Sequence, residues 1–283
     1  MVRDSSRFSP TLSSYRLTAL LLWVFLPFCV FGQQVVMERL GDWTNDSIPL
    51  HGSLQGMAIY GHRAVLLRHG GQCMIADLKK HRVEHVFQMS GNSSHCNNAS
   101  FAPKKHHSDQ WPLLYVSGCF GDKACYVTRL SDTGSAIVQR IFYDSDCFPV
   151  AQDWCVDSEG KKIYAYGGRK GHTLYLKEFH LPDLSSAEVH LTDNDVLRTI
   201  PIHCVKVAQG SKIHHGKAYL PDGDEAGHYW LHIVDLASGS EIRSIDLNGI
   251  GLEPEGVDVQ GRWIYVSFNS PNIEENKIIR FKK

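Results

Sequence analysis

Five short segments of this 283-residue sequence begin in the same way, and the same succession of strand-like runs follows each of them. Each segment begins with an amide or acidic residue, often followed by glycine, and has an apolar residue at its fifth position. The five first residues are Gln55, Asn97, Gln152, Gln209 and Glu255. Two further runs of β-branched and aromatic residues, separated by turns, follow each start. Repetition on this scale predicts one structural unit used five times.

The spacing of these starts predicts a β-propeller. They are separated by 42, 55, 57 and 46 residues, close to the length of about 40–50 residues that is typical of a four-stranded blade. The last unit has room for only three strands before Lys283, so we expect residues 35–40 to supply the fourth and close the ring. The predicted fold is therefore an all-β, five-bladed β-propeller with four-stranded antiparallel blades, closed by the N-terminal strand. A β-sandwich is the alternative, but it does not explain five repeated starts.

The first 32 residues have the composition of an export signal. Arginines precede an apolar run at residues 17–31, which is shorter than the roughly 20 residues needed to span a bilayer. The small residues Val30 and Gly32 suit a peptidase site before Gln33. We expect a signal peptide over residues 1–32, a single propeller domain over residues 33–283, and a periplasmic or extracellular location. An uncleaved N-terminal anchor is the alternative.

The charge of the mature chain bears on its partners. Removal of the signal takes the net charge from −1 to −3. A near-neutral chain without a basic stripe argues against a nucleic-acid partner. No second apolar run approaches the length of a membrane span, so we expect no transmembrane segment after signal cleavage.

Seven cysteines remain after the predicted cleavage. An exported protein meets an oxidising compartment, which favours disulfide bonds between some of them. Cys119 and Cys125 flank a short predicted turn, and we predict a bond between them. Cys147 and Cys155 form the next candidate pair. An odd number leaves at least one thiol free unless two chains are linked.

The five repeated starts also predict a site. The first strand of each propeller blade lines the central channel, so the five first residues are expected at one height around the channel mouth. Glu255 would then be the single acid in a ring of amides. Amides donate and accept hydrogen bonds, whereas a carboxylate only accepts them. Such a ring suits a small polar ligand, a glycan or a partner protein, unless its members only satisfy one another and channel waters.

Four neighbouring side chains extend this candidate site. Asp153 and Trp154 follow Gln152, and His95 and His203 come shortly before two of the starts. We consider all four to be candidate ligand contacts at the channel mouth. Trp154 is also a candidate core residue, and each histidine is also a candidate loop residue.

One blade start resembles a known group of proteins. The Glu-Pro-Glu-Gly sequence at 253–256, with Ile-Tyr-Val at 264–266, resembles bacterial secreted propellers of the YVTN and SMP-30-like kind. SMP-30-like enzymes are six-bladed lactonases that hold a divalent metal with a glutamate, an asparagine and an aspartate. The resemblance implies Glu255, Asn97 and Asp153 as candidate metal ligands.

The sequence therefore predicts an exported, non-enzymatic propeller that binds a ligand at the channel mouth. It lacks the motifs Gly-x-Ser-x-Gly and His-Glu-x-x-His and a phosphate-binding glycine loop, and we assign no catalytic residue. No cofactor is expected apart from a divalent cation in the alternative hypothesis, a metal-assisted hydrolase of the lactonase type. A structural envelope module is the second alternative.

Overall fold

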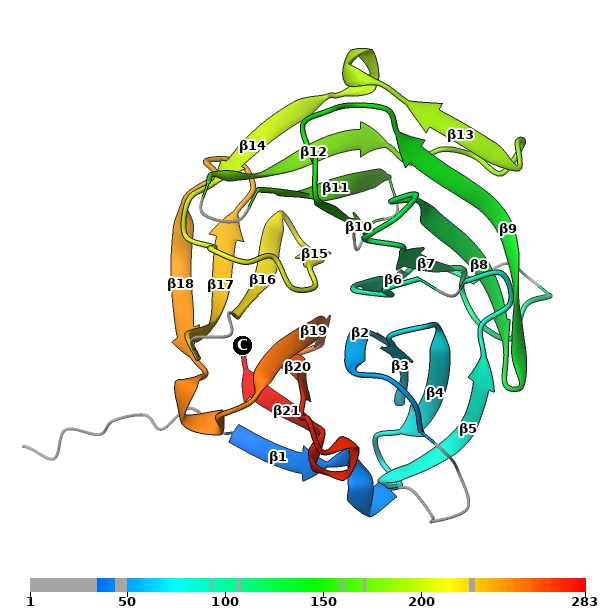
Figure 1. Cartoon of the computed structure of the whole chain (residues 1–283), viewed down its shortest axis with the longest axis vertical. Coiled ribbons are helices and arrows are strands. Elements are labelled where there is room, and N and C mark those ends of the chain that lie inside the picture. Colours follow the sequence, from blue (N-terminus) through cyan, green and yellow to red (C-terminus); the bar gives the residue numbers. More distant parts are fainter. Residues whose placement is uncertain are drawn as a thin grey trace, which may run out of the picture. The chain divides into compact units, whose positions relative to one another are not determined.

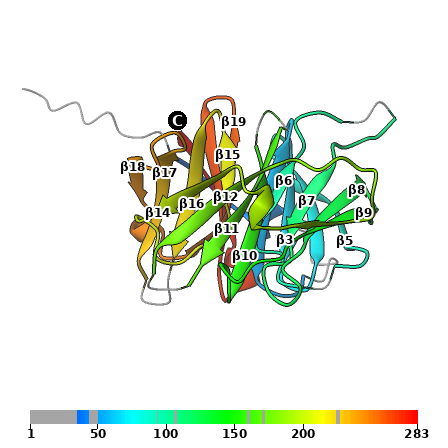
Figure 2. The same cartoon turned by 90° about the horizontal axis from the view of Figure 1, so that it is seen from above.

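A computed structural model describes residues 35–43, 50–92, 94–105, 108–157, 159, 161–169, 172–223 and 227–283. In it, five β-sheets surround a central axis, and the predicted five-bladed β-propeller is confirmed (Figure 1). Seen from the side, the strands run between the two faces of the ring (Figure 2). The predicted signal peptide lies outside the described residues.

The blades follow one another in chain order. The first contains β2 (Leu54–Tyr60), β3 (Arg63–Arg68), β4 (Gln72–Asp77) and β5 (Arg82–Gln88). The second contains β6 (Ala99–Phe101), β7 (Leu114–Ser117), β8 (Cys125–Ser131) and β9 (Gly134–Tyr143). The third contains β10 (Ala151–Val156), β11 (Lys162–Gly168), β12 (Leu174–His180) and β14 (Arg198–Ile202). The fourth contains β15 (Lys212–His214), β16 (Lys217–Gly223), β17 (Tyr229–Asp235) and β18 (Glu241–Asp246).

The fifth blade joins the two ends of the propeller. It contains β19 (Glu253–Gln260), β20 (Trp263–Asn269), β21 (Lys277–Lys282) and, as its outermost strand, β1 (Val35–Arg39). β1 pairs antiparallel with β21, from Val35 opposite Phe281 to Arg39 opposite Lys277 (Figure 1). The predicted closure of the ring by the N-terminal strand is therefore confirmed. Four short 3-10 helices complete the described elements: η1 (Leu40–Trp43), η2 (Asp193–Asp195), η3 (Asn248–Ile250) and η4 (Ile273–Glu275).

The second blade has a fifth strand that we did not predict. β13 (Glu188–Leu191) lies in the chain between β12 and β14 of the third blade, but it pairs in parallel with β9 of the second blade. It covers the outer edge of that blade, where an unpaired strand would invite association with other chains. The additional segment that contains β13 also explains why the third repeat is longer than the first.

The hydrophobic core is divided among the contacts between blades. Five clusters of buried side chains each combine residues of two neighbouring blades. Between the second and third blades, for example, Val127 packs in one cluster with Trp154 and Ile163. Both faces of the inner strands are therefore buried. This explains why these strands are apolar and aromatic along most of their length.

The cysteines do not form the predicted bonds. All seven of the described cysteines are free in the structure, so neither Cys119–Cys125 nor Cys147–Cys155 is bonded. The strand register gives the reason for the first pair: Cys125 lies opposite Ser117 in the ladder, and Cys119 lies beyond the end of β7.

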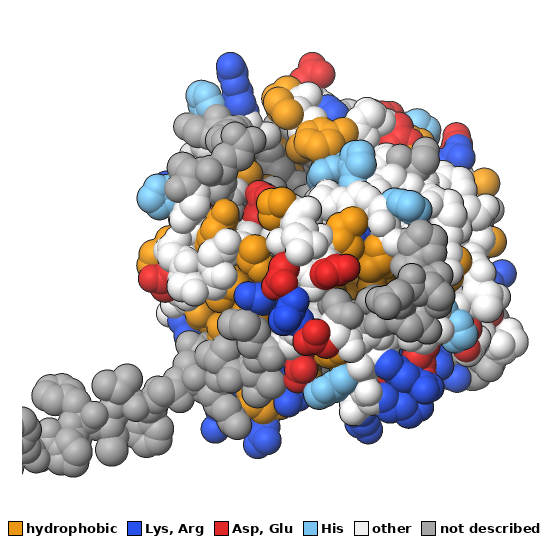
Figure 3. Space-filling model, turned by 60° about the horizontal axis from the view of Figure 1, so that its bottom comes forward, with side chains coloured by type: hydrophobic (Ala, Val, Ile, Leu, Met, Phe, Trp, Pro, Cys, Tyr) orange, Lys and Arg blue, Asp and Glu red, His pale blue; other side chains and the backbone are white. Residues whose placement is uncertain are grey.

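No helix among the described residues is long and apolar enough to cross a membrane. On the face shown in Figure 3, acidic, basic and hydrophobic side chains are interspersed.

Candidate ligand site in the axial cavity

Glycine follows the first residue of three repeats because neighbouring inner strands touch at that point. A Cβ atom on Gly56 would lie 2.9 Å from the carbonyl oxygen of Cys96. A Cβ atom on Gly256 would lie 2.7 Å from the backbone nitrogen of Met57, and Gly210 is similarly crowded. Side chains do not fit at such distances without a backbone shift. The repeated glycines therefore mark the height at which the blades meet around the axis.

Asn98 holds three blades together directly below this height. Its side-chain nitrogen donates to the carbonyl oxygen of Trp154 at 2.8 Å and to that of Ser211 at 3.0 Å. Its side-chain oxygen accepts from the backbone nitrogen of Ser211 at 3.1 Å. Asn98 is fully buried and uses both ends of its amide. It is a structural plug of the channel, and the sequence analysis did not single it out.

A cavity of about 690 Å³ lies above this plug at the mouth of the axial channel. Six of the predicted site residues line it: Gln55, His95, Asn97, Asp153, Gln209 and Glu255. Loops of the third and fourth blades add Arg169 and Lys206, and the segment before Glu255 adds Glu253. The volume is in the range typical of small-molecule sites, about 300–1,000 Å³.

Three of the predicted contacts do not line this cavity. Gln152 is buried, and its side chain donates to the carbonyl oxygen of Lys123 at 3.4 Å. Trp154 is a fully buried core residue whose indole nitrogen donates to the same carbonyl at 2.9 Å. His203 lies 3.4 Å from the hydroxyl of Thr173 and is not among the lining residues.

The register predicted for the third blade is therefore wrong by one residue. Alternate residues of a strand face opposite sides, so Asp153 takes the ring position that we gave to Gln152. Glu255 is consequently not the single acid of the ring. The sequence did not reveal the shift, because the fifth residue from Gln152 is the apolar Val156, whereas the fifth residue from Asp153 is Asp157.

Glu255 lies where the pairing of β19 is irregular. The register with β20 shifts between Pro254 and Gly256, which places Glu255 at a β-bulge. Bulges redirect side chains and are common beside functional sites. Oε1 of Glu255 accepts from the side-chain nitrogen of Gln55 at 3.3 Å. Burial, with smaller contributions from Glu253 and Asp153, holds the pKa of Glu255 well above its usual value.

Asp153 is the second buried acid of the cavity. Its Oδ2 accepts from the side-chain nitrogen of Asn97 at 2.6 Å. Burial raises the pKa of Asp153 to about 7, although the bond from Asn97 acts in the opposite direction. A carboxyl group with this pKa exchanges its proton near neutral pH. The cavity therefore contains two carboxyl groups whose pKa values are raised by burial.

Three buried acceptor atoms of residues that line the cavity make no hydrogen bond within the described part of the chain. They are Oε1 of Gln55, Oδ1 of Asp153 and Oε2 of Glu255. Each of the three residues is only 3 % exposed. Buried polar atoms in proteins are nearly always hydrogen-bonded. The cavity is therefore a place where a donor-rich group would be stabilised.

The remaining polar groups of the cavity have different properties. The rings of His95 and His69 meet edge-on, with their Nδ1 atoms 2.9 Å apart. Burial and the neighbouring His69 lower the pKa of His95 to about 4, so His95 is neutral near pH 7. Cys119 also lines the cavity, but burial and the nearby Asp153 raise the pKa of its thiol. A thiol that stays protonated is a poor nucleophile.

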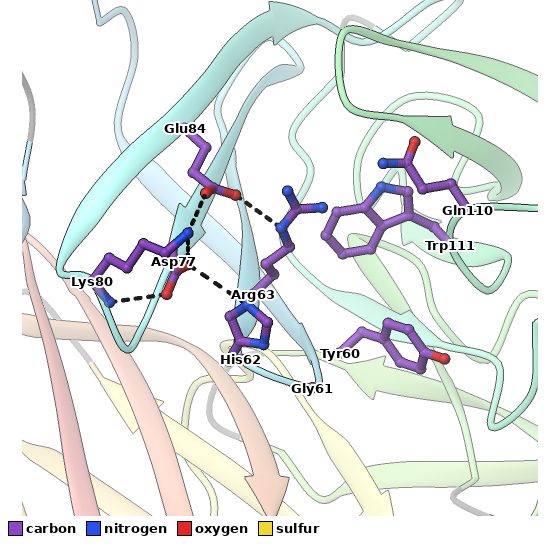
Figure 4. Close-up of a pocket in the computed structure, with 9 residues that line it drawn as sticks. All are labelled: Tyr60, Gly61, His62, Arg63, Asp77, Lys80, Glu84, Gln110 and Trp111. Carbon is purple, nitrogen blue, oxygen red and sulfur yellow. Dashed lines mark hydrogen bonds and ion pairs between the residues drawn. The ribbon is translucent and has the colours of Figure 1, made fainter.

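A second cavity, of about 330 Å³, lies at the other end of the first blade (Figure 4). Its charges balance one another: Nε of Arg63 lies 2.8 Å from Oε2 of Glu84, and Nζ of Lys80 lies 3.4 Å from Oδ2 of Asp77. The guanidinium of Arg63 also lies 5.3 Å from the centre of the Trp111 ring. The four charged side chains named here are thus held in ion pairs with one another.

The candidate metal ligands come together only in part. Glu255, Asn97 and Asp153 all line the axial cavity. Asn97, however, directs its side-chain nitrogen, a donor, toward Asp153. Within the described residues, the axial cavity contains no group of three histidine, cysteine or acidic side chains with converging ligand atoms.

The fold and this cavity define a five-bladed β-propeller with a polar axial site. A solved structure with a similar fold is the glutaminyl cyclase of Myxococcus xanthus, with a TM-score of 0.55 and 12% sequence identity. The match covers 88% of this chain and 94% of that chain. No protein-family model and no curated protein matches the sequence. The similarity shows the shared propeller fold. The chain has the five predicted blades, whereas SMP-30-like enzymes have six.

Proposed function

We propose that this protein binds a small ligand that carries a primary ammonium group, in the axial cavity. The observation that supports this proposal is the set of three buried acceptors on Gln55, Asp153 and Glu255. An ammonium group has three N–H donors and no acceptor. An ammonium group can therefore donate one hydrogen bond to each of the three unsatisfied acceptor atoms.

The charge of the site favours the same chemistry. Burial disfavours the ionised forms of Asp153 and Glu255, and the nearby carboxyl group of Glu253 adds to this effect at Glu255. A bound cation stabilises those forms, and the interaction is stronger inside a protein than in water. An anionic ligand would add to the repulsion. The cationic side chains of Lys206 and Arg169 also line the cavity. They are placed to contact a polar or acidic part of the ligand at some distance from its ammonium group.

The proposal implies linkage between ligand binding and protons. Binding of an ammonium group lowers the pKa of Asp153 and of Glu255, so the complex releases protons at neutral pH. Affinity then rises with pH while these carboxyl groups titrate. A neutral, hydroxyl-rich ligand such as a glycan would show a weaker dependence. The pH profile thus separates an amine ligand from the broader class of polar ligands.

Titration calorimetry with matched peptides tests the proposal. The probes are glutaminylglycine with a free α-amino group and its N-acetylated form, which has the same side chain but no ammonium group. We expect heat of binding for the free peptide and at least tenfold weaker binding for the acetylated one. Equal affinity for the two peptides would overturn the proposal. Glu274→Gln, which changes an exposed acid away from the cavity, provides the matched control for variants of Glu255.

A second candidate function is acid–base catalysis on such an amine. The observation that favours it is the raised pKa of Asp153, about 7, which suits a general acid or base at neutral pH. The structural neighbour, a glutaminyl cyclase, suggests which reaction to test. In that reaction the α-amino nitrogen of an N-terminal glutamine attacks its side-chain carboxamide carbon. Asp153 would first take a proton from the ammonium group, because only the free amine can attack. A C–N bond then forms, a second proton passes from the attacking nitrogen to the leaving nitrogen, and the carboxamide C–N bond breaks to release ammonia.

The same peptides distinguish binding from catalysis. Release of ammonia from the free peptide, lost in Asp153→Asn and in Glu255→Gln, would assign the chemistry to the cavity. Binding without ammonia release supports the non-enzymatic function that the sequence predicts. Titration with calcium and with zinc tests the lactonase-type alternative. Tight metal binding that is lost with Glu255→Gln would favour that alternative.

A further inference from the structure

A second cluster of chemically reactive side chains lies away from the axial cavity, between the third and fourth blades. Cys204 follows β14 of the third blade and packs against the core cluster that these two blades share. His232 lies in β17 and Glu241 begins β18, both in the fourth blade. Their ligand atoms, Sγ of Cys204, a ring nitrogen of His232 and a carboxylate oxygen of Glu241, all lie within 4.8 Å of one another.

We propose that Cys204, His232 and Glu241 bind one divalent transition-metal ion of the zinc type, which links the third blade to the fourth. Thiolate, imidazole and carboxylate are the ligands that zinc uses in proteins. Three protein ligands leave one position of a tetrahedral ion for water, and the partial exposure of Cys204 and the exposure of Glu241 give water access. The proposal is independent of the axial cavity and of the ligand proposed there.

The surroundings of His232 support a metal-binding role. Its Nδ1 lies 2.6 Å from Oε1 of Glu241, and its Nε2 lies 3.4 Å from Oδ2 of Asp222 on the opposite side of the ring. A histidine that binds a metal through one nitrogen commonly donates its other N–H to a carboxylate, which fixes the orientation of the ring. Asp222 is placed for that function as a positioning residue, with His232 binding the ion through Nδ1.

Asp222 is itself held in place. It is only 4 % exposed, and its carboxylate accepts from the backbone nitrogens of Lys206 at 3.2 Å and Val207 at 2.9 Å. Trp230 stacks near His232, with ring centres 6.4 Å apart, and limits how the imidazole can turn. Small shifts of Cys204 and Glu241 would bring all three ligand atoms to the metal distances of about 2.0–2.3 Å.

Two interpretations compete for this cluster. In the metal-free interpretation, His232 stays doubly protonated and bridges the carboxylates of Asp222 and Glu241, and Cys204 makes no specific interaction with them. In the metal-bound one, the ion replaces the proton on Nδ1, and the Cys204 thiolate is a ligand. Only the second requires Cys204, so cobalt spectroscopy, which detects a thiolate ligand directly, separates the two.

The experiment uses the reduced protein after removal of metals by a chelator. Cobalt(II) is added in steps, and the thiolate-to-cobalt charge-transfer absorption is recorded. We expect one equivalent of cobalt per chain, micromolar affinity or tighter, and complete displacement of the signal by zinc. Cys204→Ser should abolish the charge-transfer band, whereas Cys147→Ser, at a partly exposed cysteine elsewhere, should leave it unchanged.

A second variant tests the positioning residue and covers the case in which Cys204→Ser fails to fold. Asp222→Asn should keep the charge-transfer band but weaken metal affinity about tenfold or more. Zinc should also raise the melting temperature of the unmodified protein. Absence of the band in the unmodified protein would overturn the proposal in favour of the metal-free ion triad. Its survival in a folded Cys204→Ser protein would also overturn it.

Discussion

The side-chain nitrogen of Asn97 lies 2.6 Å from Oδ2 of Asp153, and this hydrogen bond joins side chains of the second and third blades beside the axial cavity. This bond satisfies one oxygen of Asp153 and leaves its Oδ1 without a donor among the described residues. Gln55 and Glu255 repeat the arrangement between the first and fifth blades: one bond joins them, and each keeps one unsatisfied oxygen. Two inter-blade pairs thus keep unsatisfied acceptors beside one cavity.

The first prediction concerns Glu255. Burial raises the pKa of this carboxyl group well above its usual value, and a glutamine has nearly the same shape. We therefore expect Glu255→Gln to change the free energy of unfolding at neutral pH by less than about 1 kcal/mol. Its affinity for an ammonium ligand should fall by about 1.5–3 kcal/mol, the contribution of a hydrogen bond to a charged group. Thermal unfolding and calorimetry measure the two effects separately. Unfolding of the variant without loss of affinity would make Glu255 a structural residue.

The second prediction concerns pH and Asp153. Burial raises the pKa of Asp153 to about 7, whereas an unfolded aspartate titrates near 4. Between these values the folded state binds more protons than the unfolded state, so Asp153 makes stability fall as pH rises. Asp153→Asn should remove this contribution. The free energy of unfolding in urea, measured from about pH 4 to pH 8 in both proteins, should show a stability difference that favours the variant increasingly with pH. A constant difference would contradict the buried, protonated state.

The third prediction concerns Asn98, which joins three blades below the cavity. Asn98→Ala leaves the buried carbonyl of Trp154 and the backbone nitrogen of Ser211 without these partners. We expect a loss of about 2–4 kcal/mol in the free energy of unfolding, since each unsatisfied buried group costs about 1–3 kcal/mol. Asn194→Ala, at an exposed position in η2, is the control and should be nearly neutral. A small change in the free energy of unfolding for Asn98→Ala would contradict the role of Asn98 in holding the three blades together.

The fourth prediction concerns the glycines of the repeat. Gly256→Ala places a Cβ atom 2.7 Å from the backbone of Met57, where neither strand can move without disturbing a blade. The expected destabilisation is about 1–3 kcal/mol, the usual effect of overpacking. Gly249→Ala is the matched control, because a Cβ atom there meets nothing within 4 Å. Chemical denaturation of the two variants measures the difference. Equal stabilities would contradict the close approach of the inner strands.

The architecture could be predicted from the sequence because propeller blades are repeated and each repeat has a recognisable start. The amide-glycine pairs at Gln55–Gly56 and Gln209–Gly210 indicate both the ring position and the close packing at the axis. The closing strand was predictable from the incomplete last repeat. β13 was not, because it pairs with a blade other than the one that surrounds it in the chain.

The candidate site was less accessible to sequence analysis. In the third repeat Trp154 occupies the position of the usual glycine and Asp157 that of the usual apolar fifth residue, so the pattern favoured Gln152 over Asp153. Arg169 and Lys206 reach the cavity from loops, whose paths do not follow the strand periodicity. The cluster at Cys204 and His232 is assembled from distant segments, and no short motif marks it.

A crystal structure of the protein with bound glutaminylglycine tests the central claim most directly. The account predicts the α-amino nitrogen of the peptide within about 3 Å of Oε2 of Glu255, Oδ1 of Asp153 and Oε1 of Gln55, the distance of an N–H···O hydrogen bond. Density for the peptide elsewhere would contradict the account. The account would also be contradicted if, at a peptide concentration that saturates binding in solution, only ordered water were bound to these three oxygens.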